Sequence, residues 1–190
     1  MIFIISIFII IGFHELAHLI VAKLCKCPVD VFSIGFGKPI LYSKKIGNTI
    51  YQITPWILGG YCKLKDELKS SNNEEAFSNL TYMKKVIISL AGIGMNLFTG
   101  LICYYIGLRY NMYVLIYFGY MSMILGLTNA VPFPALDGSY PILFLLENFM
   151  EKEKALKIIS VMCKVGFAII MVLNIVFLPL LLLMVFKGQI

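Results

Sequence analysis

The chain contains two histidines, and both lie in the five-residue segment His14-Glu15-Leu16-Ala17-His18. Residues four apart stack on one face of an α-helix, so both imidazoles can point at one metal ion. Glu15 follows the first histidine and lies close enough to act on a water held by that metal. This spacing on a helix is the pattern of zinc-dependent peptide hydrolysis. We therefore predict that His14 and His18 bind Zn²⁺ and that Glu15 is the catalytic base.

The metal-binding pattern lies in an apolar chain. Of its 190 residues, 60% are hydrophobic and 14% are charged, and the mean hydropathy is +0.89, which is too apolar for an average soluble domain. Runs long enough to cross a hydrocarbon core of about 30 Å occur at residues 2–24, 86–108, 113–131 and 165–186. We predict an α-helical polytopic membrane protein with about four transmembrane helices, forming one domain over residues 1–190. The first run has no basic residue before it, so we expect it to be retained and not cleaved as a signal peptide.

Basic residues predict the orientation of the chain. Arg109 is the one basic residue between the second and third spans, whereas lysines cluster in the connections before the second span and before the fourth. Both termini are therefore expected outside a bacterial cell membrane. The formal net charge of +6 is explained by this topology and by contact with anionic lipid, so no nucleic acid is needed as a partner.

The segment between the first two spans predicts a small β structure. Residues 40–46 and 49–53 resemble strands around the turn Gly47-Asn48, which indicates a membrane-associated β-hairpin. Residues 55–61 are apolar but too short to span, so they are expected to re-enter the membrane or to form a surface loop. This hairpin and re-entrant region covers about residues 33–64. A strand at 49–53 offers an edge on which an extended substrate can pair.

Two polar segments flank the remaining spans. Residues 66–79 are predicted to be a flexible linker. Residues 139–157 mix apolar and charged side chains, which indicates one or two amphipathic helices along the membrane face.

A third metal ligand is needed, because catalytic zinc usually has three protein ligands and one open position. Asp137 follows the third span in a segment where two prolines break the helix and apolar residues surround the carboxylate. A lone carboxylate there is costly unless it is paired or bound to metal. The first and third spans run in the same direction, so His14, His18 and Asp137 can meet near the inner leaflet. The alternative is that Asp137 is an ordinary turn residue before Gly138.

The five cysteines have no disulfide-like spacing. Most are predicted on the cytoplasmic side, where thiols stay reduced. Cys25, Cys27 and Cys62 leave a second zinc site open as an alternative, although a single C-x-C pair is a weak signal.

The combination of H-E-x-x-H in the first helix with a distant N-x-x-P-x-P-x-L-D-G resembles the site-2 protease family of intramembrane zinc metalloproteases. Residues 33–37 and 58–63 are similar to the membrane-associated β-loop of that family. Residues 90–96 resemble its A-G-P-x-x-N segment, with Ile93 in place of the usual proline. The connection at 108–112 is too short for the PDZ domains of many bacterial members, so the chain resembles a bacterial-type member without them.

The resemblance implies roles for individual residues. It implies that Asp137 is the third zinc ligand and that Asn96 and Asn129 hold substrate backbone near the active site. Gly59 and Gly60, in the β-loop, are likewise expected to bind substrate. For both asparagines, ordinary hydrogen bonding between helices is an equal alternative.

The expected reaction is hydrolysis of a peptide bond in or beside a transmembrane segment of a membrane-protein substrate. By resemblance, the substrates are single-span regulators, such as anti-sigma factors, or signal-peptide remnants. One competing hypothesis is a proteolytically inactive zinc-binding membrane scaffold or sensor. Another is a metal transporter, for which the spans hold few polar residues. Oligomeric state is not indicated by the sequence.

Overall fold

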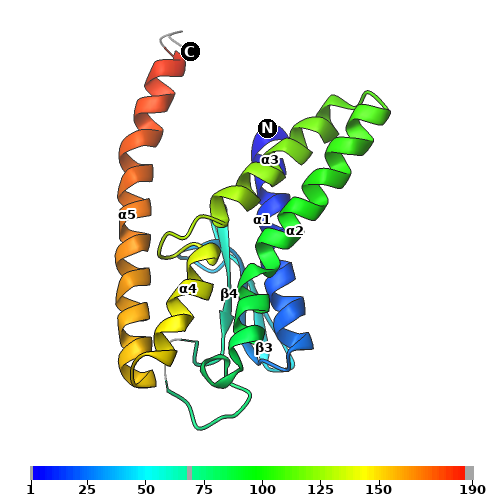
Figure 1. The fold of residues 1–190 in the computed structure, drawn as a ribbon. Helices are drawn as coiled ribbons and strands as arrows, with labels where there is room; N and C mark the ends of the chain where they lie inside the picture. The colour runs from blue at the N-terminus through cyan, green and yellow to red at the C-terminus, as the bar shows by residue number, and fades with distance from the viewer. Residues whose placement is uncertain (1, 68–69, 187–190) are drawn as a thin grey trace.

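The computed structural model describes residues 2–67 and 70–186 as a helical protein with a small sheet between its first two long helices (Figure 1). The long helices are α1 (Ile2–Leu24), α2 (Tyr82–Arg109), α3 (Tyr113–Asn129) and α5 (Lys152–Phe186). The strands are β1 (Val29–Phe36), β2 (Tyr42–Ile46), β3 (Thr49–Ile53) and β4 (Trp56–Leu64). Shorter helical turns are η1 (Phe77–Asn79), η2 (Asp137–Ser139), α4 (Tyr140–Leu145) and η3 (Leu146–Asn148).

Three helices of the described chain are long and apolar enough to cross a membrane. They cover Ile5–Leu24, Tyr82–Arg109 and Lys152–Val172. The fourth predicted span, α3, is a shorter apolar helix of 17 residues, about 25 Å at 1.5 Å per residue. The predicted count of four spans is therefore not confirmed, and α5 begins at Lys152, before the predicted span at 165–186. The start of α1, the α2–α3 turn and the far end of α5 lie at the same end of the molecule (Figure 1).

The α2–α3 pair is tight because glycines face the partner helix. A Cβ added at Gly119 would lie 2.5 Å from the backbone nitrogen of Tyr104, and one at Gly100 would lie 3.0 Å from the carbonyl oxygen of Gly119. Small residues permit such close approach in membrane helix pairs, where lipid gives no hydrophobic driving force. Ser122 of α3 also donates to the carbonyl oxygen of Asn96 at 2.9 Å. These contacts fix the middle of α2 relative to the chain that leaves α3.

The sheet has the strand order β2-β3-β1-β4. β2 and β3 form the predicted hairpin around Gly47, which has φ +60°, and they pair antiparallel. The rest differs from the expectation, because β3 also pairs in parallel with β1, and β4 pairs antiparallel with β1. The predicted hairpin is thus half of a four-stranded sheet. Turn signals predict neighbouring strands, whereas the parallel pairing of β1 with β3 has no local sequence signal.

The structure corrects two details of this region and leaves its membrane insertion as a prediction. Residues 56–61 are not a loop, because they form the first part of β4. The strand at 49–53 offers no edge, because β2 and β1 occupy both of its sides. The edge strands of the sheet are β2 and β4.

The expected linker at 66–79 is anchored at its end. Phe77 is 1% exposed, and its ring centroid lies 5.5 Å from that of Phe144 in α4. The side-chain amide of Asn79 donates to the carbonyl oxygens of Ser71 and Asn73 at 2.8 and 2.7 Å. Composition alone predicted disorder here because one buried aromatic among polar residues hardly changes an average.

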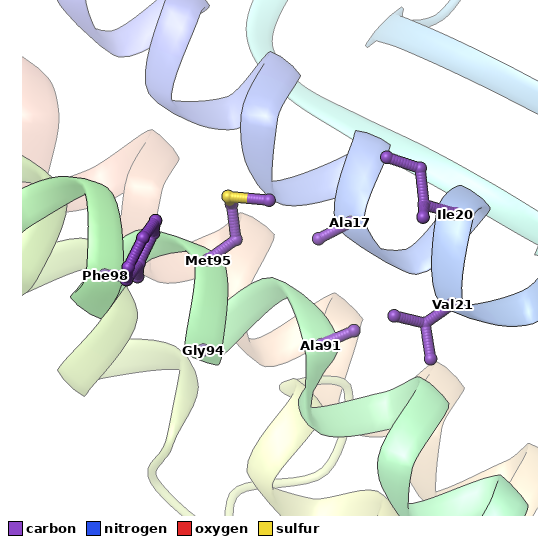
Figure 2. Close-up of a pocket in the computed structure, with 7 residues that line it drawn as sticks. All are labelled: Ala17, Ile20, Val21, Ala91, Gly94, Met95 and Phe98. Atoms are coloured by element: carbon purple, nitrogen blue, oxygen red, sulfur yellow. The ribbon is translucent and has the colours of Figure 1, made fainter.

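α1 and α2 lie side by side, and residues of both helices line an apolar hollow of about 260 Å³ (Figure 2). Its lining residues are Ala17, Ile20, Val21, Ala91, Gly94, Met95 and Phe98. None of these side chains carries a polar donor or acceptor suited to a metal or to proton transfer. The chemistry must therefore lie on another face of α1.

Candidate active site

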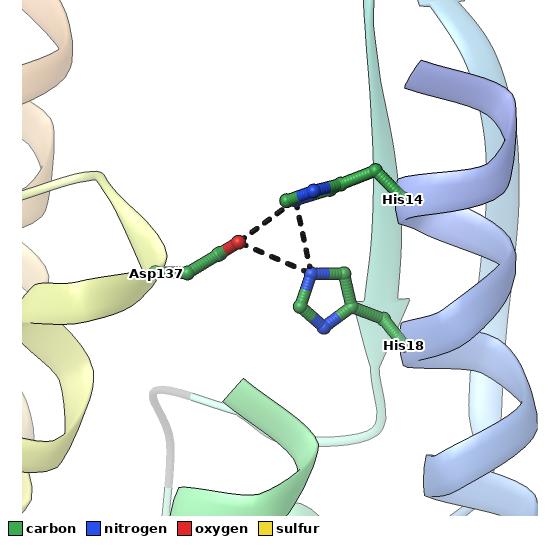
Figure 3. A group of neighbouring side chains, drawn as sticks. All are labelled: His14, His18 and Asp137. Carbon is green, nitrogen blue, oxygen red and sulfur yellow. Dashed lines mark hydrogen bonds and ion pairs between the residues drawn. The ribbon is translucent and has the colours of Figure 1, made fainter. Parts of the chain in front are cut away.

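His14 and His18 lie one turn apart on α1, and their imidazoles converge on Asp137 at the start of η2 (Figure 3). Asp137 Oδ2 lies 2.8 Å from His14 Nε2 and 3.2 Å from His18 Nε2. The two Nε2 atoms are 3.2 Å apart. Within residues 2–67 and 70–186, this is the one group of three or more His, Cys, Asp or Glu side chains that lie close enough together to hold a metal ion. The structure thus brings the three predicted ligands together.

The triangle of ligand atoms fits zinc. Donors about 2.0–2.1 Å from a tetrahedral ion lie about 3.3 Å from one another, close to the three observed separations. His14 is 5% exposed and His18 is 8% exposed, so little water competes for these atoms. Two imidazoles and one carboxylate are a usual catalytic set that leaves a fourth position open.

The other ring nitrogen of His18 fixes its tautomer. His18 Nδ1 lies 2.8 Å from the carbonyl oxygen of Ile88 in α2, an acceptor, so Nδ1 carries the hydrogen and donates. The lone pair of Nε2 then faces the metal position. Histidine ligands of zinc are oriented in this way.

The contact between His14 and Asn96 bears independently on whether His14 binds a metal ion. His14 Nδ1 lies 3.0 Å from the amide nitrogen of Asn96, while the amide oxygen of Asn96 is buried and has no partner. A His14 that binds metal through Nε2 must carry its hydrogen on Nδ1 and needs an acceptor there. Rotating the Asn96 amide by 180° places its oxygen at that point, and amide orientation is an assignment that hydrogen bonding must decide. The orphaned oxygen is thus explained when His14 is a metal ligand.

Glu15 lies beside the ligands and faces β4. The backbone N–H of Cys62 donates to its carboxylate. A Cβ added at Gly60 would lie 2.8 Å from Glu15 Cγ and 2.9 Å from the carbonyl oxygen of Ser33. Only glycine therefore lets β4 come this close to the base.

The remaining predicted residues have different surroundings. Gly59 faces the opposite side of β4 from Gly60, as strand alternation requires, and a Cβ there would overlap the ring of Phe36. Asn96 is fully buried and contacts His14 instead of an open substrate position. Asn129 is half-buried at the end of α3. Gly60 is therefore beside the site, whereas Gly59 serves packing.

The cysteines do not form a second metal site. Cys25, Cys27 and Cys62 are free thiols, and in the described part of the chain they are not among the grouped metal ligands. Among the described residues, these three sulfur atoms are therefore not grouped closely enough to hold a metal ion.

One residue at the site was missed by sequence reasoning. Gly92 of α2 faces both imidazoles, and a Cβ added there would lie 2.5 Å from His14 Nε2 and closer still to His18 Nε2. A glycine has no functional group to attract attention. The only signal was its place in the segment that resembles A-G-P-x-x-N.

Glu67, in the turn after β4, is a further acidic group near the site. Burial raises the pKa of its carboxyl to about 7. The negative charges of Asp137 and Glu15 raise this pKa further, and a protonated His18 would lower it. The pKa of Glu67 therefore depends on the charges of the ligand cluster.

Comparison with known proteins agrees with this geometry. The sequence profile of peptidase family M50 matches residues 2–116 and 109–173, and the chain belongs to this family, that of the site-2 proteases. The family prediction is thus confirmed, and the family implies Zn²⁺ as the bound metal.

Individual relatives support the same assignment. A protein of Borreliella burgdorferi is 41% identical over 125 residues, which cover 60% of this chain and 28% of the relative. A protein of Neisseria meningitidis is 38% identical over 106 residues, which cover 54% and 24%. One of Campylobacter jejuni is 36% identical over 102 residues, which cover 51% and 27%. All three are named for an inferred zinc metalloprotease activity, and the matches span about a quarter of their length.

Proposed function

We propose that the protein is an intramembrane zinc metalloprotease that hydrolyses peptide bonds in or beside transmembrane segments of other proteins of a bacterial cell membrane. The observation that carries this proposal is that two of the three grouped ligands, His14 and His18, lie on α1, a helix suited to crossing the membrane. His18 lies six residues before Leu24, about 9 Å along the helix, which supports a site within the bilayer. The lysine distribution supports a site near the inner leaflet and both termini outside.

The chain supplies the groups that hydrolysis needs. When bound, zinc lowers the pKa of water to about 7 and polarises a carbonyl oxygen. Glu15, next to His14 in sequence, takes the proton from the attacking water and passes it to the leaving amine. His14, His18 and Asp137 hold the metal, and the contacts of both imidazoles with α2 keep them in one orientation.

A helical substrate must unwind before its peptide bond can react, because its carbonyls are hydrogen-bonded within the helix. An unwound segment is stabilised when its backbone pairs with an edge strand of a sheet. β4 is an edge strand of the sheet, and its Gly60 lies against Glu15. We assign substrate pairing to β4, which replaces the strand at 49–53 of the sequence prediction.

The test uses the protein purified in detergent, with measured zinc per chain and a panel of single-span substrates that includes anti-sigma-factor spans and signal-peptide remnants. Wild type is expected to hold one zinc and to cleave members of the panel. Glu15→Gln should keep the zinc and lose cleavage, whereas Asp137→Ala should lose both. A Glu15→Gln protein that fully replaces wild type in cells would instead support the inactive scaffold.

A further inference from the structure

Outside the ligand triangle, the described residues contain two ion pairs with very different exposure. Lys154 and Glu151 lie 2.9 Å apart with side chains 72% and 75% exposed, which is typical of a weak surface pair. Lys85 Nζ lies 2.7 Å from both carboxylate oxygens of Glu147, with side chains 3% and 16% exposed. Lys85 and Glu147 therefore form a largely buried, two-point contact.

This buried pair joins the two segments that complete the metal site around α1. Lys85 is in the first turn of α2, three residues before Ile88, whose carbonyl accepts from His18. Glu147 is in η3, which follows α4 and lies ten residues after Asp137. The pair therefore ties the helix that orients the imidazoles to the segment that carries the third ligand.

Neighbouring contacts stiffen both sides of the pair. Lys85 Nζ lies 5.3 Å from the ring centroid of Phe144, which is 2% exposed and belongs to α4. The hydroxyl of Tyr82, at the start of α2, donates to the carbonyl oxygen of Pro141 at 3.1 Å. A displacement at η3 is thus transmitted to η2 through a short, packed helix and not through a loop.

A contribution to folding stability does not by itself explain why Lys85 and Glu147 form a buried ion pair. Apolar side chains of similar size often stabilise a buried position as well as an ion pair, because removing two charges from water is costly. An apolar contact tolerates small shifts, whereas separating a buried ion pair leaves an uncompensated charge and is strongly destabilising. We propose that Lys85 and Glu147 are positioning residues that set the register of Asp137 against His14 and His18. The proposal rests on the metal site and not on proteolysis.

The test measures metal binding, so it stands apart from the cleavage assay. The zinc dissociation constant is determined by chelator competition, and the geometry by the absorption spectrum of the cobalt-substituted protein. Glu147→Asp keeps the charge but shortens the side chain by about 1.5 Å, and Glu147→Gln keeps the shape but removes the charge. Both should weaken zinc binding about 10- to 100-fold, as changes around metal ligands do, and should alter the cobalt spectrum. Glu151→Gln, in the exposed pair, should change neither.

A double variant separates positioning from stability. In the metal-free state, the double variant Lys85→Met with Glu147→Leu should unfold at the same temperature as wild type. Its zinc binding should nevertheless be weaker than that of wild type. The proposal is overturned if this double variant binds zinc as tightly as wild type. It is also overturned if both single variants at Glu147 keep wild-type zinc affinity and the wild-type cobalt spectrum.

Discussion

Gly92→Ala should strongly weaken zinc binding without changing any ligand. The new Cβ would lie 2.5 Å from His14 Nε2, and an ordinary contact needs at least 3.4 Å. The imidazoles must therefore retreat by about 0.9 Å, whereas zinc sites keep ligand distances within about 0.2 Å. We expect the zinc affinity to fall by at least about 100-fold, or about 2.7 kcal/mol.

Gly94→Ala is the matched control. Gly94 lies on the same helix, and a Cβ there meets no atom within 4 Å. Both substitutions give α2 the same gain in helix propensity, about 1 kcal/mol. Any difference in metal binding thus reports the contact with the imidazoles and not the helix.

The assay is chelator competition on each purified variant, followed by thermal unfolding with and without metal. Gly94→Ala should match wild type in zinc affinity. If Gly92→Ala binds zinc within twofold of Gly94→Ala, the imidazoles do not meet the metal in the arrangement described, and the reasoning is refuted.

Three further outcomes are expected. Asn96→Ala should weaken zinc binding about 10- to 100-fold in chelator competition, because His14 loses the acceptor for Nδ1–H, while Asn96→Asp, which can only accept, should retain most of the affinity. Stripping the metal with a chelator should lower the unfolding temperature of wild type, since zinc at 1,000 times its dissociation constant contributes about 4 kcal/mol, and an unchanged temperature would contradict a tight site. In the metal-free protein, the raised pKa of Glu67 means that its favourable contribution to folding is full below about pH 4.5 and is lost as the pH rises through about 7. Metal-free Glu67→Gln should therefore be more stable than metal-free wild type at pH 8.5, by at most about 3 kcal/mol, and little different at pH 4.5. Exposed Glu74→Gln should show no such dependence on pH in the same unfolding series.

The part of the site that sequence could predict is the part with local geometry. His14 and His18 need only the helical repeat to converge, and Glu15 is fixed by its place between them. Asp137 was found by a different argument, the cost of a carboxylate among apolar residues. The distances of Asp137 from the imidazoles depend on how α3 and η2 fold back onto α1, which has no local sequence signal.

The features that sequence missed depend on contacts between distant segments. Gly92 matters because it lacks a side chain where two rings approach, which no pattern within α2 reveals. The Gly47 turn predicted the hairpin, but pairing of β1 with β3 involves strands that are not consecutive, and it removed the expected free edge. Phe77 turned an apparent linker into part of the core by one ring contact.

The metal site joins residues 119 positions apart, from His18 to Asp137. During synthesis, α1 and α2 leave the ribosome long before Asp137 does, so a half-made chain has both imidazoles and the base but lacks the carboxylate. Such a nascent chain holds an incomplete set of metal ligands. The order of the ligands along the chain thus delays assembly of the metal centre until its third helix has been made.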